Sequence, residues 1–482
     1  MSILRSVPEL ETFLQSQSLT LAECGLEYLR SNTNPFPLRI PEHYARLINW
    51  RDLSDPLKLI VVPQPEEEQV QEYELADPIG DAAHEAVPGL IHRYPDRVLL
   101  LLTTYCHIHC RFCFRREVVG RVRPIDFVKI REYLAEHTEV SEVIFSGGDP
   151  FTYPVGFLRS LQEQLSALEH IKIWRFHTRI PATDPEAINN KWLEVMNSFS
   201  GQKVVVLHVD HPREVSAETV SLIQMLSARG CVLLSQTVLL KGVNNSRETL
   251  LELFRTLMQH GVKPYYLHHL DRAQGTHHYR LGIEEGLALF QSLRGHLSGI
   301  CLPEYVLDLP GGYGKIPVAW LEKGEDQEND IDRHKTYFAH TFEGKTVKYV
   351  DHTTYQRKVA PSHYRTQVLP GLKLGRTIGF PTLNLDPETI PKDTRLGVHA
   401  ARVTHNGKAY DGALYYGPRL VLNETKTILE IFLINFNQEI YGEEVEFSIQ
   451  KHIRGIMDFA SFEEMKTQLE QDIEDVKVSL EE

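Results

Sequence analysis

The sequence contains few cysteines and no long apolar run. Six cysteines among 482 residues are sparse, and Cys24, Cys231 and Cys301 are scattered singly, which fits a reducing compartment. No apolar stretch approaches the roughly 20 residues that a membrane helix needs. The first residues, MSILRSVPELETFLQ, show no basic segment followed by an apolar core, so we expect no signal peptide. We therefore expect a cytoplasmic protein that does not bind a membrane.

Positive charge is also scarce. The chain has 51 Lys and Arg against 65 Asp and Glu, which gives a formal net charge of −14. This balance argues against broad binding to phosphate backbones, so we expect no nucleic-acid partner. Hydrophobic residues make up 42% of the chain and charged residues 24%, as in an ordinary globular protein, and the length predicts two or more domains.

Three of the cysteines stand close together in the run TTYCHIHCRFCFRR. Cys106, Cys110 and Cys113 have the spacing C-x3-C-x2-C, which places three thiolates in one loop. Three thiolates hold three irons of a [4Fe–4S] cluster and leave the fourth iron open to another molecule. A zinc-bound scaffold without redox chemistry is the alternative. It is disfavoured because a closed zinc site takes four ligands and neither His107 nor His109 has the usual spacing.

Up to about residue 320, apolar β-branched stretches alternate with segments of helical spacing. Near-continuous apolar strands separated by helices are typical of a parallel sheet covered by helices. Six such units predict a partial (βα)6 barrel, with Asp184, Ser216 and Ser246 as N-caps or first-turn residues. The predicted strands are Arg97–Thr103, Glu142–Ser146, Ile171–Thr178, Lys203–Val209, Cys231–Leu239 and Lys263–His269. The predicted helices are Asp126–His137, Val155–Glu169, Pro185–Phe199, Arg213–Arg229, Ser246–His260 and Gly282–Leu297.

Chemistry in βα barrels gathers at the C-terminal ends of the strands. The cysteine loop follows the first predicted strand, and Gly147-Gly148-Asp149 follows the second. Paired glycines let the backbone approach a ligand, and an acidic residue beside them can pair with an ammonium group, although such a run is also an ordinary turn. Later strands end in further polar residues: His208, Asp210, His211, Gln236 and Asp271. Independent pieces therefore converge on one end of the barrel.

Several longer strings are collinear with one known family. They are VPGLIHRYPDRVLLLLTTYC, RFCFRR, FSGGDP, HTRIPAT, SQTVLLKGVN, KPYYLHHLD and LDLPGGYGKIPV. Over roughly residues 30–358 the chain resembles the radical S-adenosylmethionine (SAM) enzymes, and among them the lysine 2,3-aminomutase family. The resemblance implies a [4Fe–4S] cluster, SAM and pyridoxal phosphate (PLP). It also implies an electron donor such as a flavodoxin or ferredoxin, and migration of an amino group from C2 to C3 of an amino acid.

The resemblance assigns cofactor roles residue by residue. Cys106, Cys110 and Cys113 match the cluster ligands, and the loop Gly147-Gly148-Asp149 matches the loop that meets the amino group of SAM. Lys315, in Gly311-Gly312-Tyr313-Gly314-Lys315, matches the lysine that forms the Schiff base with PLP; alone it would be an exposed turn lysine. Gln236 is expected to contact cofactor or substrate.

The resemblance also assigns the substrate contacts. Arg115 matches the arginine that pairs with the substrate carboxylate, a task that suits a guanidinium fork. Asp271 and Asp308 match two aspartates that hold the remote ammonium of lysine, although Asp308 is also explained as a turn acid before Pro310. Lysine is the leading substrate, with glutamate or another amino acid as the alternative. The stereochemistry stays open, because the chain shares features with the branch that makes (R)-β-lysine for elongation factor P and lacks the C-terminal zinc cysteines of other members.

The pattern changes after a charged connector at residues 321–335 and a predicted hairpin at Phe338–Tyr355. Short strands then alternate with turns, at Gly397–Thr404, Ala409–Tyr416, Thr427–Phe436 and Glu444–Gln450. Asn406-Gly407 is a strong hairpin signal, and an amphipathic helix at Ser461–Leu480 ends the chain. These features predict a small antiparallel β-barrel with a C-terminal helix.

The segments LPGLKLGRTIGFPTLNL and LEIFLINFNQEIYGEEVEFSI resemble the riboflavin kinase family, as do Arg454, Phe459 and Asp472. The resemblance covers roughly residues 361–482. It implies that Thr382 and Asn384 bind Mg²⁺ and nucleotide phosphate, that Glu430 is the general base, and that Gly375 and Arg376 lie in the phosphate loop. The stretch YYGPRLVLNETKT departs from the family, and because no HxGH element of a nucleotidyl-transfer domain is seen, we expect FMN and not FAD as the product. A non-catalytic flavin- or nucleotide-binding module is therefore the alternative.

Together these features predict a bifunctional enzyme that acts on an amino acid, riboflavin and ATP; a homo-oligomer is compatible with the sequence. The fold class is α/β, a partial (βα)6 radical SAM barrel followed by a small antiparallel β-barrel. The predicted domains are a helical and extended N-terminal region at 1–90, the core at 91–320, a linker and hairpin at 321–360, and the kinase-like domain at 361–482.

Overall fold

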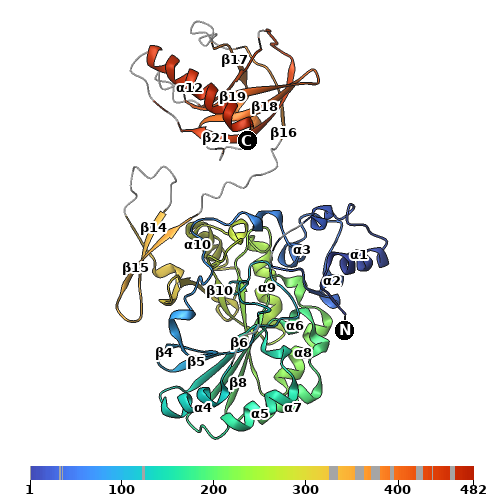
Figure 1. Cartoon of the computed structure of the whole chain (residues 1–482), viewed down its shortest axis with the longest axis vertical. Coiled ribbons are helices and arrows are strands. Elements are labelled where there is room, and N and C mark those ends of the chain that lie inside the picture. The colour runs from blue at the N-terminus through green and yellow to red at the C-terminus, as the bar shows by residue number, and fades with distance from the viewer. Residues whose placement is uncertain are drawn as a thin grey trace. The chain divides into compact units, whose positions relative to one another are not determined.

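The structure is a computed structural model of the whole chain. It describes residues 2–481 except 32–33, 35, 122–124, 325–334, 353–362, 371–379, 391–393, 395, 419–426, 437, 456 and 458–461. The chain divides into two compact units, Met1–Tyr355 and Gln356–Glu482 (Figure 1).

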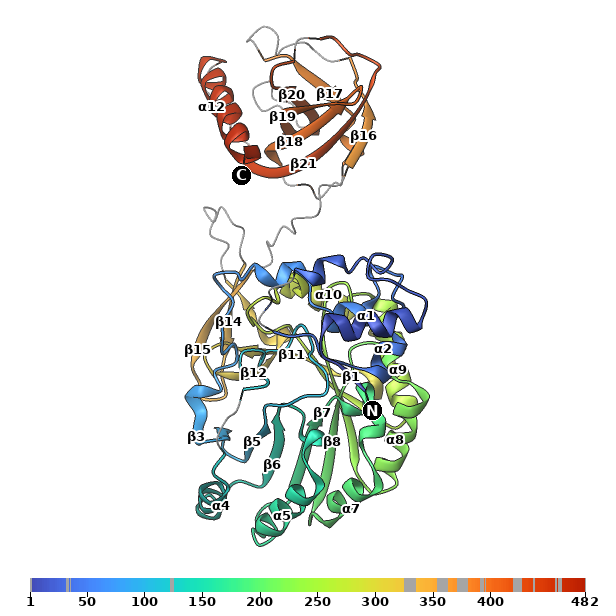
Figure 2. The ribbon, with the colours of Figure 1, turned by 45° about the vertical axis from the view of Figure 1, so that its right-hand side comes forward.

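A ten-stranded open sheet forms the centre of the first unit (Figures 1 and 2). Its order is β12-β11-β10-β9-β8-β7-β6-β5-β4-β3, and β5 to β11 pair in parallel. The parallel strands are β5 (Arg97–Thr103), β6 (Glu142–Gly147), β7 (Ile173–Thr178), β8 (Gln202–His208), β9 (Val232–Val238), β10 (Lys263–His268) and β11 (Glu304–Leu309). Antiparallel strands β3 (Glu85–Val87), β4 (Leu90–Tyr94) and β12 (Gly314–Pro317) flank them. This arrangement confirms the predicted partial barrel and adds a seventh parallel strand, β11.

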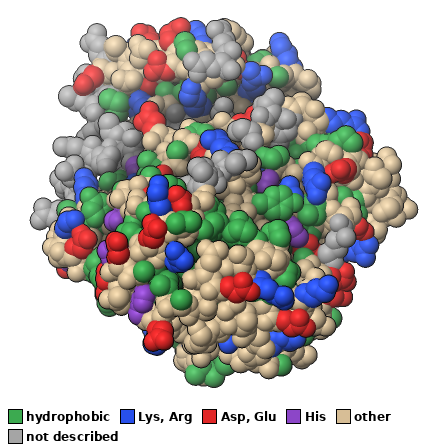
Figure 3. Space-filling view, turned by 60° about the horizontal axis from the view of Figure 1, so that its bottom comes forward, with side chains coloured by type: hydrophobic (Ala, Val, Ile, Leu, Met, Phe, Trp, Pro, Cys, Tyr) green, Lys and Arg blue, Asp and Glu red, His purple; other side chains and the backbone are tan. Residues whose placement is uncertain are grey.

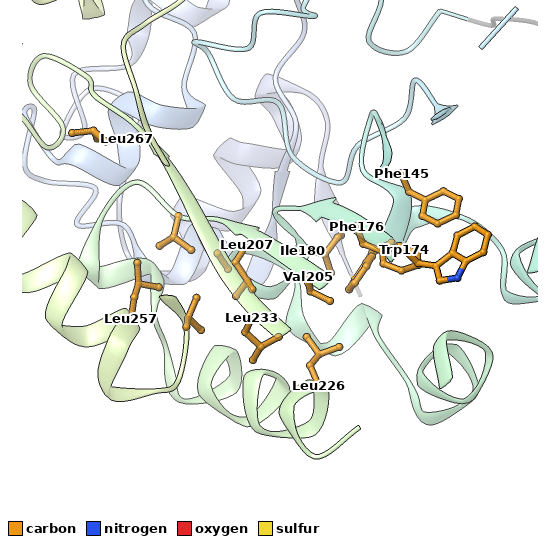
Figure 4. Packing of buried hydrophobic residues seen from close by; sticks show 14 of the residues in the cluster. Phe145, Trp174, Phe176, Ile180, Val205, Leu207, Leu226, Leu233, Leu257 and Leu267 are labelled. Carbon is orange, nitrogen blue, oxygen red and sulfur yellow. The ribbon is translucent and has the colours of Figure 1, made fainter. Parts of the chain in front are cut away.

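Helices cover one face of this sheet (Figure 2). They are α4 (Phe127–Glu136), α5 (Val155–Leu165), α6 (Ile180–Thr183), α7 (Asn190–Ser198), α8 (Ala217–Ser227), α9 (Arg247–Gln259) and α10 (Ile283–Ser292). Figure 4 shows Trp174 and Phe176 of β7 beside Val205 and Leu207 of β8, with Leu226 of α8 close by. Successive side chains of a strand point to opposite faces. The residues that alternate with this core therefore line the other, inner face of the sheet.

The N-terminal segment builds a second core. It contains β1 (Ile3–Leu4), α1 (Val7–Ser16), β2 (Ile40–Pro41), α2 (Glu42–Leu47) and α3 (Pro56–Val61). This core includes Ile108 and Phe112 of the cysteine loop and Leu240 after β9. The segment thus packs directly on the loop that carries the three cysteines. At the other end of the unit, β13 (Glu322–Lys323), β14 (Lys335–His340) and β15 (Thr346–Asp351) form a small antiparallel sheet.

The second unit is a curled six-stranded antiparallel sheet with one long helix. Its order is β16-β21-β18-β19-β20-β17. The strands are β16 (His363–Gln367), β17 (Thr382–Leu385), β18 (Gly397–His405), β19 (Lys408–Pro418), β20 (Thr427–Leu433) and β21 (Glu444–Arg454), and the helix is α12 (Phe462–Glu481). Residues Val403, Leu414, Ile431 and Phe447 are fully buried in its core. The predicted all-antiparallel fold with a C-terminal helix is confirmed.

The charged side chains on the visible surface do not separate by sign. Acidic and basic side chains intermix on the face shown in Figure 3. Within the described part of the chain, no helix combines the length and apolar character that crossing a bilayer requires.

Candidate functional site

The cysteine loop follows β5 and is fixed by buried ion pairs. Arg111 and Arg116 both donate to the carboxylate of Glu67, at 2.6 Å each for the Nη2 atoms, and Glu67 is fully buried. His109 is linked through Nδ1 to the carbonyl of Pro37 at 2.9 Å. Removing one partner of a buried Arg–carboxylate pair strongly destabilises the folded protein, because the other charge is left buried and unpaired. The N-terminal segment therefore holds the loop that carries the cysteines.

Cys106, Cys110 and Cys113 are free thiols in this loop. Burial raises the pKa of all three, to about 12 for Cys110, and neighbouring anionic groups raise the pKa of Cys106 further. Thiolates crowded in one half-buried loop need a positive partner, which iron supplies. No three His, Cys, Asp or Glu side chains among the described residues are arranged to hold one metal ion. A cluster differs because each cysteine binds a separate iron. The donor set therefore fits a [4Fe–4S] cluster.

The loop Gly147-Gly148-Asp149 lies against the backbone of the cysteine loop. A Cβ on Gly147 would come within 2.3 Å of the Thr103 carbonyl oxygen, and one on Gly148 within 2.2 Å of the Tyr105 carbonyl oxygen. Only glycine permits this approach at either position. The amide of Asp149 donates to the Tyr105 carbonyl at 2.9 Å. The two loops that the sequence placed at one end of the barrel are thus hydrogen-bonded neighbours.

The carboxylate of Asp149 is fully engaged within the protein. Oδ1 accepts from the amide of Phe151 at 2.9 Å and the hydroxyl of Thr178 at 2.8 Å, and Oδ2 accepts from the amides of Arg179 at 2.7 Å and Ile180 at 3.1 Å. Burial raises its pKa even so. The Asp149 side chain therefore connects the segments that follow β6 and β7. The groups of this loop that can bind a ligand are then those of its backbone.

A buried charge network lies close enough to Cys110 for Arg179 to lower the pKa of its thiol. Arg179 pairs through Nη1 with Asp210 and through Nη2 with Glu214 at 2.5 Å. Tyr44 donates to the same Glu214 oxygen at 2.8 Å. Asp210 was expected among the polar residues at the strand ends. In the structure it has a structural role, because it pairs with Arg179 in this network.

Arg115 projects beside a pocket of about 360 Å³ whose lining includes Asp77, Thr103, Phe114 and Gly147. Its Nε and Nη2 donate to Asp81 Oδ2 at 3.1 and 2.7 Å, and its Nη1 donates to the hydroxyl of Ser146 at 3.2 Å. Arg93 also donates to Asp81, at 3.2 Å. Burial raises the pKa of Asp81, but the two arginines outweigh it and lower the pKa. Two cations against one carboxylate leave a net positive site, which suits a second carboxylate.

Asp308 and Lys315 form an ion pair on the inner face of the sheet. They are register partners on β11 and β12, and Lys315 Nζ lies 2.8 Å from Asp308 Oδ1. The other oxygen, Oδ2, lies 3.5 Å from Nδ1 of His268. Burial, and after it the charge of Asp308, raise the pKa of Asp271 to about 8. The structure thus brings Asp271, Asp308 and Lys315 together.

Histidines extend this inner face. The rings of His177 on β7 and His208 on β8 lie 5.6 Å apart. The Nε2 atoms of His177, His208 and His268 are buried without a hydrogen-bond partner among the described residues. Burial lowers the pKa of all three, to about 3 for His208. Gln236 is the register partner of His208 on β9. Neutral imidazoles with unused polar atoms fit a ligand that fills this interior, and PLP is one such group.

In the second unit, two of the predicted residues lie directly against Glu430. Asn384 on β17 is the register partner of Glu430 on β20, and the Thr382 hydroxyl donates to Glu430 Oε2 at 3.3 Å. Arg454 and Asp472 form a double ion pair, with both distances 2.6 Å. Gly375, Arg376 and Phe459 lie outside the described residues. Oxygen donors gathered on one sheet face suit Mg²⁺.

Several site residues were missed from the sequence. Glu67 lies in a short 3₁₀ helix at Pro65–Glu68 and Asp81 directly precedes another at Ala82–His84, and neither carries a motif. Gly80 packs on the glycine loop that precedes Lys315, since a Cβ there would meet Gly312 N at 2.3 Å. Tyr94 accepts from the backbone amide of Lys315 at 2.9 Å. The one sequence signal for these residues is that the segment ADPIGDAAH, which contains Gly80 and Asp81, combines acidic residues with a glycine.

An open parallel sheet with three free cysteines on the loop after its first parallel strand defines a radical SAM enzyme, here joined to a second enzyme domain. The radical SAM superfamily model matches residues 100–263, and the riboflavin kinase model matches residues 359–480. The putative L-lysine 2,3-aminomutase of Aquifex aeolicus is 35% identical over 330 residues, covering 67% of this chain and 87% of that protein. The chain therefore belongs to the lysine 2,3-aminomutase family, whose members use a [4Fe–4S] cluster, SAM and PLP.

Two further relatives bear the same description. The L-lysine 2,3-aminomutase of Methanococcus maripaludis is 32% identical over 320 residues, covering 65% of this chain and 73% of that protein. That of Bacillus subtilis is 29% identical over 402 residues, covering 80% and 83%. Among solved structures, riboflavin kinase from Trypanosoma brucei is 20% identical and covers 25% of this chain and 80% of its own, with a TM-score of 0.19.

Proposed function

We propose that the first unit moves the α-amino group of L-lysine to its β-carbon and that the second unit phosphorylates riboflavin to FMN. The observation that supports the amino-acid substrate is the charge pattern of the inner face. Arg115 offers a cation there, and Asp271 and Asp308 offer carboxylates. An amino acid with a carboxylate at one end and an ammonium at the other complements this pattern.

Lysine fits the pattern better than glutamate. The remote carboxylate of glutamate would face Asp308, which is buried, and Asp271, which is half-buried. Like charges in a buried site repel and neither is well solvated. A remote ammonium would instead gain a charge-assisted hydrogen bond to the ionised Asp308 and a further hydrogen bond to Asp271. The relatives described as L-lysine 2,3-aminomutases support the same choice.

In this proposal each group has one task. Cys106, Cys110 and Cys113 hold the cluster, and Lys315 holds PLP. When bound, the cluster with SAM supplies a hydrogen-abstracting radical and PLP supplies delocalisation. Arg115, which Asp81 orients through the Nε–Nη2 edge, binds the substrate carboxylate through its remaining N–H groups. His177, His208 and His268 are neutral, so they do not repel the substrate ammonium that binds to the aspartates.

The aminomutase is tested anaerobically with iron, sulfide, PLP, SAM and a reductant, either chemical or a flavodoxin or ferredoxin. We expect L-lysine to yield β-lysine, resolved by chiral chromatography, and L-glutamate to yield nothing. Cys110→Ala and Lys315→Ala abolish the product, whereas Cys231→Ala, a cysteine outside the loop, retains it. SAM cleavage without any change in lysine would contradict the substrate and leave the radical SAM assignment intact.

For the second unit, the contact of Thr382 and Asn384 with Glu430 supports catalysis. A carboxylate beside two oxygen donors for Mg²⁺ can take the proton of a hydroxyl next to the metal-bound phosphate. We expect FMN from riboflavin and Mg-ATP. Tight riboflavin binding without FMN formation would instead indicate the non-catalytic flavin module.

A further inference from the structure

Arg39 lies along the cysteine loop and contacts it on both sides of Cys106. Its guanidinium stacks on the ring of Tyr105, with Cζ 4.2 Å from the ring centroid. Its carbonyl accepts the amide of His109 at 3.0 Å. Tyr105 directly precedes Cys106, and His109 follows it three residues later. The N-terminal segment thus holds a cation beside the first of the three cysteines.

The other two cysteines also have arginines nearby. Burial raises the pKa of Cys110 and Cys113, whereas the charge of Arg179 lowers that of Cys110 and the charges of Arg115 and Arg116 lower that of Cys113. Positive charge close to a thiolate stabilises the anion. Arginines are therefore distributed around the whole cysteine loop.

These arginines differ from Arg39 in their partners. Each of them pairs with a carboxylate: Arg179 with Asp210 and Glu214, Arg115 with Asp81, and Arg116 with Glu67. Arg39 lies within ion-pair distance of no carboxylate in the described part of the chain, and its guanidinium donates to the neutral hydroxyl of Tyr105. No neighbouring carboxylate therefore offsets the charge of Arg39.

The surroundings of Cys106 are otherwise anionic. Burial raises the pKa of its thiol, and neighbouring anionic groups, with Asp149 first among them, raise it further. Burial and the charge of Arg5 lower the pKa of Arg39, whereas the Cys106 thiolate raises it. Arg39 is half-buried, and charges that are partly removed from water interact more strongly than exposed ones. Arg39 thus brings an uncompensated positive charge to the anionic side of the loop.

We propose that Arg39 raises the reduction potential of the [4Fe–4S] cluster that the three cysteines hold. This inference rests on the proposed function of the cysteine loop. One electron, taken from a reductant that is thereby oxidised, adds negative charge to a cluster that three thiolates already make anionic. A cation held beside the cluster stabilises this more negative, reduced form. Arg39 therefore favours reduction of the cluster from outside the set of ligands.

The test measures the reduction potential of the reconstituted cluster in the full chain without SAM, followed by the electron paramagnetic resonance signal of the reduced form. Arg39→Gln removes the charge, and Arg39→Lys retains it. Arg46→Gln is the matched control, because Arg46 belongs to the same segment but is exposed. We expect the equilibrium constant for reduction of Arg39→Gln to be about tenfold below that of the wild type, the effect of one charge near a partly buried site, or about 59 mV for a one-electron couple. Arg39→Lys and Arg46→Gln should stay within about threefold of the wild type.

A second variant leaves Arg39 and its stacking in place. Arg5 is exposed, and its charge is, after burial, the largest influence that lowers the pKa of Arg39. Arg5→Glu puts a carboxylate near Arg39 without changing the cysteine loop. We expect it to lower the reduction potential as Arg39→Gln does, but by a smaller amount, because an exposed charge is screened.

An unchanged potential in both Arg39→Gln and Arg5→Glu would overturn the proposal. Equal losses in Arg39→Gln and Arg39→Lys would overturn it too, because they would show that the shape of the side chain matters and not its charge. Weaker SAM binding by Arg39→Gln with an unchanged potential would also overturn it and would identify Arg39 as a contact of SAM. Iron content and circular dichroism show whether each variant holds the cluster and is folded. If Arg39→Gln holds no iron, Arg5→Glu decides.

The outcomes separate this inference from the proposed function. If the wild type holds the cluster and rearranges L-lysine but the potential does not depend on Arg39, only the role of Arg39 fails. If the potential depends on Arg39 but the wild type rearranges no lysine, the role of Arg39 is correct and the proposed reaction is wrong.

Discussion

Gly80→Ala tests how the N-terminal segment positions the loop that carries Lys315. Gly80 has φ +68°, and a Cβ on it would lie 2.3 Å from the amide nitrogen of Gly312. Real Cβ atoms do not approach closer than 3.0 Å, so the two backbones must separate by about 0.7 Å. Neither partner has a side chain that can turn away. The shift therefore falls on the loop Gly311–Lys315.

The matched control is Gly261→Ala. Gly261 has φ +78°, but a Cβ there meets nothing within 4 Å. Both variants bear the cost of alanine in a left-handed conformation, about 1–2 kcal/mol. Gly80→Ala bears in addition an overpacking cost of about 1–3 kcal/mol. The difference between the two variants isolates the contact with the lysine loop.

The assay is a titration of each variant with PLP, followed by absorbance, together with thermal unfolding. Misplacing a reacting group by about 1 Å costs up to roughly 100-fold. We expect Gly80→Ala to bind PLP about tenfold more weakly than the wild type and Gly261→Ala to bind it like the wild type. Equal PLP affinity of the two variants would refute the view that Gly80 fixes the position of Lys315.

Three other predictions address the cluster, the kinase and the buried acid. Cys110→Ser should lose the visible absorbance of a reconstituted iron–sulfur cluster, whereas Cys231→Ser should retain it. Glu430→Gln should slow FMN formation by about 100-fold or more, the contribution of a general base, while Glu446→Gln on β21 retains the rate. Asp271 has a folded-state pKa of about 8, above its unfolded value. Its contribution to stability is therefore present below pH about 4 and is lost as pH rises through about 8. In Asp271→Asn, the denaturation midpoint should therefore change less with pH over that window than in the wild type. An unchanged slope of midpoint against pH would contradict the raised pKa.

Local patterns predicted the elements of the fold well where local forces decide. Ser216 and Ser246 cap α8 and α9 by accepting the amides of Thr219 and Thr249, each at 3.2 Å. Asp184 instead lies 2.7 Å from the ring of His107 and caps no helix with its side chain. Asn189 caps the helix that follows. A carboxylate that finds a tertiary partner leaves the cap to another residue, and no local pattern reveals that choice.

The helices were predicted longer than they are. The segment predicted as one helix at Arg213–Arg229 consists of a short 3₁₀ turn at Pro212–Glu214 and α8 at Ala217–Ser227. The side chain of Glu214 turns inward to Arg179 and accepts from the amides of Asp210 and His211, so this buried contact caps the start of the turn. Strand β11 (Glu304–Leu309) is not among the predicted strands, because only its second half falls in the string LDLPGGYGKIPV and that half is assigned by resemblance alone. The predicted domain boundaries and the roles of the site residues stay predictions.

The sequence by itself determined the chemistry that this chain can carry. Three cysteines at fixed spacing, a double glycine after an apolar strand and a lysine after a glycine run are local patterns, because each depends on neighbours within a few residues. The tertiary structure alone decided which charges face one another. Asp81 on Arg115, Glu67 on two arginines and Asp308 on Lys315 are pairs that parallel strands and a folded-back N-terminal segment bring together. Burial then gives these pairs their strength, since charges removed from water interact far more strongly than exposed ones.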